Sequence, residues 1–276
     1  NALSDHFVAE VSREGEVHQM KFCRGEVTQP IKVIGKTKRT GTKITFHPDP
    51  EIFVATQEFK YDTLVRRMRE LAFLVPGITV EMKDQRSNRS DKFEFKEGIA
   101  EYVSFLNANE ERLFDKPILM SAEVDFTDLA NPRVMADGEK PKPGMRRMTV
   151  DVALQYNDRY DEMVFSYTNL INQPEGGTHL SGFRSALTRV INAFAKGNNL
   201  LKDKDPQITG DDVREGLAAV ISIKHSDPKF ESQTKVKLLS PEVEGIVGSL
   251  SYEGLNQYFE TNPAVGKRIV DKALNA

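Results

Sequence analysis

Residues 175–197 read EGGTHLSGFRSALTRVINAFAKG, and this stretch decides the fold of the second half of the chain. Its apolar side chains recur at steps of three and four residues, at Leu180, Phe183, Leu187, Val190, Ile191 and Phe194. This spacing puts them on one face of a helix, so we predict a helix over residues 179–196 with that face in a core. Gly176 and Gly177 open the helix, but no lysine of the phosphate-loop kind follows them.

Strands and further helices are predicted on both sides of this helix. Alternation or apolar runs predict strands at residues 119–124, 148–157, 163–168 and 218–223, the last of them buried. Helical spacing returns at residues 240–259 and 263–273. Asp211 and Asp212 are adjacent carboxylates, which suit either a magnesium ion or the start of a helix. We favour a helix cap over a metal site.

The first part of the chain also mixes strands with helices. Residues 7–12 and 17–22 alternate apolar and polar side chains around a charged turn, which is the pattern of a β-hairpin. Further strands are predicted at residues 43–46, 78–83 and 92–96, and helices at residues 59–75 and 98–107. This mixture predicts an α/β (α+β) chain of two domains, with a boundary just before residue 98.

Residues 128–147 separate two of the predicted strands and contain the run ANPRVMADGEKPKPGMRR. Proline, glycine and charged residues dominate the run, so it is unsuited to a buried element. Because insertions of this kind usually lie on the outside of a fold, we predict a surface insertion here.

Composition limits the function. The charge is nearly balanced, with 38 Lys+Arg against 41 Asp+Glu and a formal net charge of −3, so any contact with DNA must come from a local basic patch. A single cysteine excludes a disulfide scaffold within the chain. The five histidines lack ligand spacing, and we predict no metal site from them. No apolar run is long enough for a membrane span and no signal-peptide pattern opens the chain, so a cytoplasmic location is expected.

Five sequence blocks occur in one order along the chain. They are Asn1-Ala2-Leu3-Ser4; Thr40-Gly41-Thr42; Glu175-Gly176-Gly177-Thr178-His179-Leu180 leading to Gly182-Phe183-Arg184; Gly210-Asp211-Asp212-Val213-Arg214-Glu215-Gly216-Leu217; and Asp227-Pro228-Lys229-Phe230-Glu231-Ser232-Gln233-Thr234-Lys235. In this order they resemble the gyrase B family of type II DNA topoisomerases. The resemblance covers nearly the whole chain except the insertion.

The resemblance implies a fold and an activity. Residues 1–97 would be the later half of a Bergerat-type (GHKL) ATPase domain, and residues 98–276 a transducer domain similar to domain 2 of ribosomal protein S5. The chain is therefore expected to be an internal fragment, with residues missing upstream of Asn1. The family uses ATP and Mg²⁺ to close a dimer around double-stranded DNA and drive negative supercoiling. Its partner is the gyrase A subunit, in a heterotetramer of two A and two B subunits, and it is an antibiotic target.

The resemblance also assigns roles to five residues. Gln233 and Lys235 would contact the γ-phosphate of ATP, and Thr42 would support recognition of adenine. A lysine is a compact charge that suits a terminal phosphate. Arg13 matches an arginine at the rim of the pocket that binds coumarin antibiotics, and Arg184 a residue that lines the cavity for the transported DNA. The pattern alone gives each residue a simpler interpretation. Gln233 and Lys235 would lie in a solvated turn, and Thr42 in a bulge or turn before a strand. Arg13 would belong to a charged turn, and Arg184 would serve solubility.

No catalytic residue is expected within this chain. In the family the glutamate general base, the asparagine that helps to hold magnesium and the glycine-rich lid all precede the segment that matches Asn1. The chain alone is therefore predicted not to hydrolyse ATP. Two alternatives stay open: the related ATPase subunit of topoisomerase IV, which relaxes or decatenates DNA, and a non-catalytic scaffold that binds nucleic acid. A sensor of the γ-phosphate argues against the scaffold.

Overall fold

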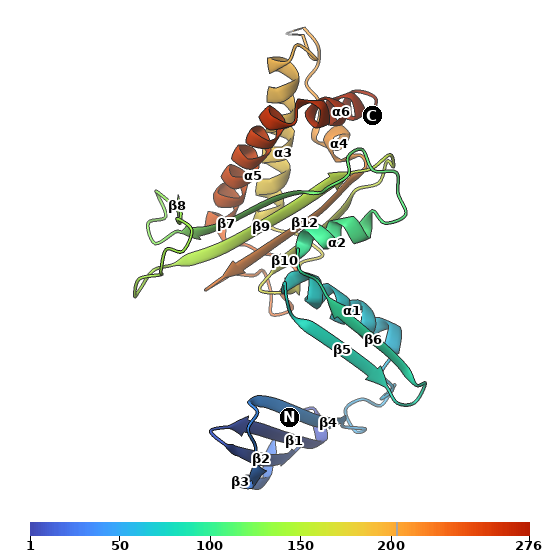
Figure 1. Cartoon of the computed structure of the whole chain (residues 1–276), viewed down its shortest axis with the longest axis vertical. Helices are drawn as coiled ribbons and strands as arrows, with labels where there is room; N and C mark the ends of the chain where they lie inside the picture. The colour runs from blue at the N-terminus through green and yellow to red at the C-terminus, as the bar shows by residue number, and fades with distance from the viewer. Residues whose placement is uncertain (203) are drawn as a thin grey trace. The chain divides into compact units, whose positions relative to one another are not determined.

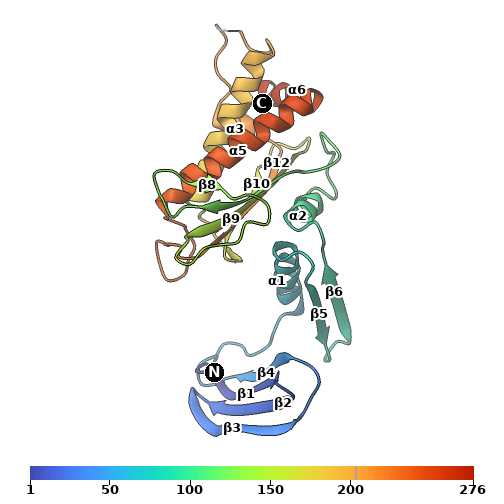
Figure 2. The same ribbon diagram turned by 60° about the vertical axis from the view of Figure 1, so that its left-hand side comes forward.

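A computed structural model of the chain describes residues 1–202 and 204–276 (Figures 1 and 2). These residues form two compact units, Asn1–Leu64 and Val65–Ala276, and the division falls within helix α1 (Tyr61–Leu74). Residues 65–97, which precede the predicted domain boundary, therefore pack with the second unit. In the part of the chain that the structure describes, no helix is both long enough and apolar enough to cross a bilayer.

The first unit is built on an antiparallel sheet of four strands. They are β1 (Ser4–Arg13), β2 (Glu16–Cys23), β3 (Glu26–Lys36) and β4 (Gly41–Pro48), in the order β3-β2-β1-β4. The predicted hairpin of β1 and β2 is confirmed, and its two-residue turn places Glu14 and Gly15 at positive φ angles of 55° and 87°. Strand β3 was not predicted; it contains Pro30, which suits the edge position it occupies.

The second unit contains a sheet of six strands. They are β7 (Ile118–Asp125), β8 (Arg133–Val134), β9 (Arg147–Tyr156), β10 (Met163–Thr168), β11 (Ile171–Asn172) and β12 (Leu217–His225), in the order β11-β10-β12-β9-β7-β8. Only the β10–β12 pair is parallel among the pairs in the described residues, because a helical crossover connects these strands.

Helices cover both faces of this sheet (Figure 1). Helices α3 (Thr178–Gly197), α5 (Pro241–Thr261) and α6 (Pro263–Leu274) pack on one face, where Ala219 and Ile221 of β12 join the core. Helix α2 (Ile99–Leu106) and the end of α1 pack on the other face with Ala218 and Val220. Because alternate side chains of β12 enter opposite cores, residues 217–221 of the strand are all apolar, and the predicted burial of residues 218–223 is confirmed.

Three smaller features complete the second unit. Strands β5 (Thr79–Asp84) and β6 (Arg89–Glu94) form a separate hairpin. Helix α4 (Gly210–Arg214) begins with a capping box between Thr209 and Asp212, so the predicted capping role is confirmed for Asp212, whereas Asp211 pairs with Arg214. The segment 128–147 lies mostly at the surface, but it contains β8 and the buried Met135.

Helices α3 and α5 approach each other closely through glycines. A Cβ atom added to Gly182 would lie 2.3 Å from the carbonyl oxygen of Glu244, and one added to Gly248 would lie 3.4 Å from the carbonyl oxygen of Gly182. Gly182 is therefore required for the close backbone contact between the two helices, whereas a Cβ atom at Gly248 would make an ordinary van der Waals contact.

Candidate functional site

The loop formed by residues 226–240 carries Gln233 and Lys235. Phe230 and Leu238 pair across its base, where the amide of Glu231 donates to the carbonyl of Lys237 at 3.1 Å and that of Leu239 to Lys229 at 2.8 Å. At its tip, the amide of Lys235 donates to the carbonyl of Ser232 at 3.0 Å. Loop 226–240 is thus a narrow hairpin that brings Gln233 and Lys235 together, with Gln233 exposed at the tip.

Lys235 is held in an unusual backbone conformation. Its φ angle is 57°, in the left-handed region that residues other than glycine seldom adopt. The side-chain amide of Gln173 donates a hydrogen bond to the backbone carbonyl of Lys235 at 3.3 Å. The ammonium of Lys235 lies 5.6 Å from the centre of the Phe230 ring. No carboxylate of the described residues pairs with this ammonium, so it is a cation that is free to meet an anion.

Backbone hydrogen bonds connect loop 226–240 to the start of α3. The amide of Leu238 donates to the carbonyl of Gly176 at 3.0 Å, and the amide of Thr178 donates to the carbonyl of Leu238 at 3.2 Å. A Cβ atom on Gly177 would lie 2.2 Å from the carbonyl oxygen of Leu238, and the φ angle of Gly177 is 136°. Only glycine fits there, and the loop therefore lies directly against the N-terminus of α3.

His225 joins loop 226–240 to two other elements. Its Nδ1 accepts a hydrogen bond from the amide of Asp227 at 3.0 Å, so the ring proton resides on Nε2, which donates to Glu242 of α5 at 3.1 Å. Its backbone is paired at both polar atoms with the side chain of Asn169, at 2.8 Å each. Burial lowers the pKa of His225, although Glu242 opposes this effect, which is consistent with a neutral ring.

In the first unit, Arg13 and Thr42 share one face of the sheet. Thr42 of β4 is directly opposite Val11 of β1, and Arg13 is the next residue of β1 on that face. The two predicted residues are therefore diagonal neighbours across adjacent strands. Both are exposed, and Arg13 makes an ion pair with Glu14 at 3.1 Å.

Arg184 lies elsewhere in the second unit, on α3. Its guanidinium donates two hydrogen bonds to the carboxylate of Glu162, at 3.1 and 2.7 Å. This ion pair balances part of the positive charge of Arg184. It lines a shallow groove of about 650 Å³ with three further cationic side chains, those of Arg189, Lys196 and Arg214. Because four cationic side chains line this groove, its chemistry suits phosphate groups.

The structure thus places the predicted residues in three locations: Gln233 and Lys235 in one loop, Arg13 and Thr42 on one sheet face, and Arg184 in the α3 groove. Gln173, Gly177 and His225 were not predicted as site residues. Gly177 carried a signal, since paired glycines before a helix indicate close backbone approach. Gln173 and His225 carried none, because single polar residues at strand ends have many roles. Among the described residues, no group of three or more His, Cys, Asp or Glu side chains is arranged to hold a metal ion.

Comparison with solved structures identifies the class of fold. The 43K ATPase domain of Thermus thermophilus gyrase B, solved in complex with an aminocoumarin, matches with a TM-score of 0.77 and 38% sequence identity. The match covers 99% of this chain and 69% of that chain. The chain therefore has the α+β fold of the GHKL ATPases of this type.

Sequence comparison identifies the family. The family model described as DNA gyrase B matches residues 98–276. The DNA gyrase B subunits of Clostridium acetobutylicum and Halalkalibacterium halodurans are each 45% identical to this chain over its full length. The chain spans 40% of the length of each relative. It belongs to the DNA gyrase B family.

Proposed function

We propose that this chain is the nucleotide-sensing and coupling part of a gyrase B subunit, whose ATP cycle drives strand passage and negative supercoiling of double-stranded DNA. The observation that carries the proposal is the backbone junction between loop 226–240 and α3. A γ-phosphate would attract the unpaired ammonium of Lys235, and hydrolysis would remove that contact. Since the loop is fixed to α3 at Gly177, its position reports the state of the nucleotide to that helix.

The remaining site residues have parts in the same proposal. Thr42 takes part in adenine recognition, and Arg13 lies at the rim of an inhibitor pocket. Their position on one face of the sheet supports a role at the same site. Arg184 and its basic groove contact the backbone of the transported DNA. ATP and Mg²⁺ are the cofactors, the gyrase A subunit and DNA the partners, and binding of ATP drives self-dimerisation in the cytoplasm. Residues 1–97 and 98–276 are the ATPase and transducer segments.

Substitution of Lys235 tests this function. In gyrase assembled from the full-length subunit and its A partner, Lys235→Ala is expected to lower ATP-dependent supercoiling at least 100-fold, because the phosphate loses its one charged contact from the loop. Lys237→Ala is the matched control: that lysine pairs with Glu231 at 3.2 Å and is expected to change supercoiling less than threefold. Full supercoiling by Lys235→Ala would refute the sensor role.

The 276-residue chain alone is expected to show no ATP turnover, which a coupled phosphate-release assay measures.

A further inference from the structure

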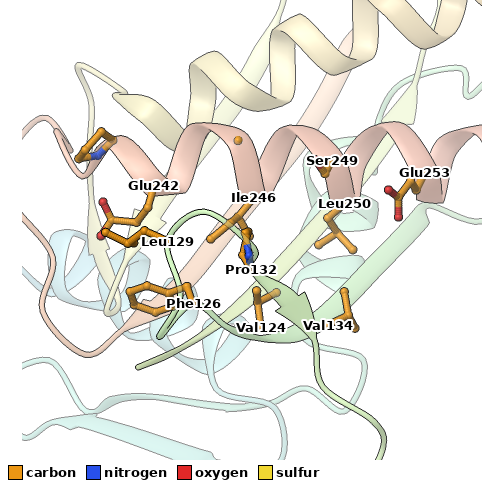
Figure 3. A pocket seen from close by; sticks show the side chains of 12 residues that line it. Val124, Phe126, Leu129, Pro132, Val134, Glu242, Ile246, Ser249, Leu250 and Glu253 are labelled. Atoms are coloured by element: carbon orange, nitrogen blue, oxygen red, sulfur yellow. The ribbon is translucent and has the colours of Figure 1, made fainter. Parts of the chain in front are cut away.

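A groove of about 560 Å³ opens between α5, the end of β7 and the segment 128–147 (Figure 3). Its lining combines apolar side chains with polar ones: Val124, Phe126, Leu129, Val134, Ile246 and Leu250 beside Glu242, Ser249 and Glu253. Leu129 is 57% exposed and Val134 58% exposed, although both are large apolar side chains. The groove has the volume of a small-molecule site, and none of the five predicted site residues lines it.

The outer wall of the groove is a built structure. Strand β8 pairs with β7, and the buried Met135 donates its amide to the carbonyl of Glu123 at 2.7 Å. Arg133 donates two hydrogen bonds to Glu139, at 2.9 and 2.6 Å, which close the segment on itself. The proline-rich insertion is therefore anchored at the point where it forms the wall.

Two carboxylates mark the ends of the groove, as Figure 3 shows. Glu242 and Glu253 both lie on α5, about 16 Å apart along the helix axis. Glu242 is already occupied: it accepts a hydrogen bond from His225 at 3.1 Å and lies 3.8 Å from the guanidinium of Arg146. Glu253 makes no hydrogen bond or ion pair with any residue that the structure describes.

We propose that this groove binds a small amphipathic cation, whose apolar body lies along α5 and whose ammonium or guanidinium pairs with Glu253. Charge complementarity selects the occupant: the uncompensated carboxylate at one end favours a cation and disfavours an anion. The apolar walls reward an aromatic or aliphatic body, and the volume fits one ligand of drug-like size.

The other end of the groove gives the occupant a route to loop 226–240. Phe126 lines the groove, and its ring packs at a tilt against that of His225, with 4.9 Å between the ring centres. His225 bonds to both Glu242 and the loop residue Asp227. A ligand that contacts Phe126 is therefore one residue away from His225, which bonds to the base of the loop. This consequence rests on the proposed function, whereas binding itself does not.

Methyl-resolved NMR titration of the full chain with 4-phenylbutylamine tests the proposal. We expect saturable shifts confined to the methyl groups of the groove, above all those of Val134, Ile246 and Leu250. The neutral isostere 4-phenylbutan-1-ol and the variant Glu253→Gln with the amine should each bind about three- to fivefold more weakly, the value of one exposed ion pair. The acid 4-phenylbutanoate should bind still more weakly.

A second variant fills the groove. Gly245 lines the groove, and a Cβ atom added to it meets nothing within 4 Å, so Gly245→Leu is chosen to add a side chain beside Ile246. We expect this variant to weaken amine binding at least tenfold while the methyl spectrum far from α5 stays unchanged. If Gly245→Leu does not fold, Val134→Lys, an exposed substitution that adds a competing cation, should weaken binding of the amine in the same direction. Absence of saturable shifts, equal binding of amine and acid, or shifts that survive the filling variants would overturn the proposal.

Discussion

At the scale of single residues, His179 shows how burial fixes a protonation state. It lies in the first turn of α3, bonded to Gln173 at 3.3 Å, and burial lowers its pKa to about 4. The unfolded chain, with an ordinary pKa near 6.5, therefore binds this proton more readily than the folded unit. The stabilising contribution is complete above about pH 6.5 and is lost as the pH falls from there towards 4.

This difference predicts a pH dependence of stability. Protonation of His179 should remove about 2 kcal/mol of the free energy of unfolding by pH 5. Urea unfolding followed by near-ultraviolet circular dichroism reports on the second unit, because every tyrosine except Tyr61 lies there. In His179→Gln the decline between pH 7 and pH 5 should be smaller by that amount, whatever the stability at pH 7. An unchanged slope would contradict the assignment.

Residues of the candidate site could be predicted only where a motif carried them. Gln233 and Lys235 stand in a block with a recognisable order, whereas His225 ends an apolar run and finds its side-chain partners far away in the sequence. Its partners, Asn169 and Glu242, lie 56 and 17 residues away. Such a cluster forms only when the strand, the turn and α5 are placed together, and periodicity says nothing of that placement.

At the scale of elements, the junction of loop 226–240 with α3 depends on one glycine. Gly177→Ala would force its Cβ atom to 2.2 Å from the carbonyl oxygen of Leu238 and strain a positive φ angle. We expect a loss of at least about 2 kcal/mol in the unfolding free energy of the second unit. The control Gly245→Ala has open space in a helix and should stabilise by about 0.5–1 kcal/mol. Equal stability of both variants, measured by urea unfolding, would show that the junction is not tight.

Elements with strong periodicity were predicted closely, and those with mixed signals were not. The helix predicted at residues 179–196 spans Thr178–Gly197, because its apolar stripe repeats through its whole length. Strand β3 was missed because Pro30 and Gly35 interrupt its pattern, and a proline within a run argues against a central strand. It lies at the sheet edge, where its partner pattern contains irregularities. The position of a strand in its sheet is not encoded locally.

At the scale of the whole molecule, the first unit presents an apolar sheet face. The strand register puts Val11, Ile44 and Phe46 on the same face as Thr42, and Ile44 and Phe46 are 48% and 52% exposed. A surface of this kind binds hydrophobic probes. We expect the chain to enhance the fluorescence of anilinonaphthalene sulfonate, and the double variant Ile44→Lys and Phe46→Lys to reduce the enhancement by about half. Thr45→Lys, on the opposite face, is the control; an equal effect of both would contradict the placement of the patch.

The glycine contact between α3 and α5 has a mechanical consequence. Close-packed protein interiors have low compressibility and transmit strain. At Gly182 and Gly248 no side chain intervenes, so the backbones press directly on each other. The two helices should therefore move as one rigid body, from the Gly177 junction to the far end of α5. A shift of less than 1 Å in the loop would then move the far end of α5, about 30 Å away, the length of a 20-residue helix.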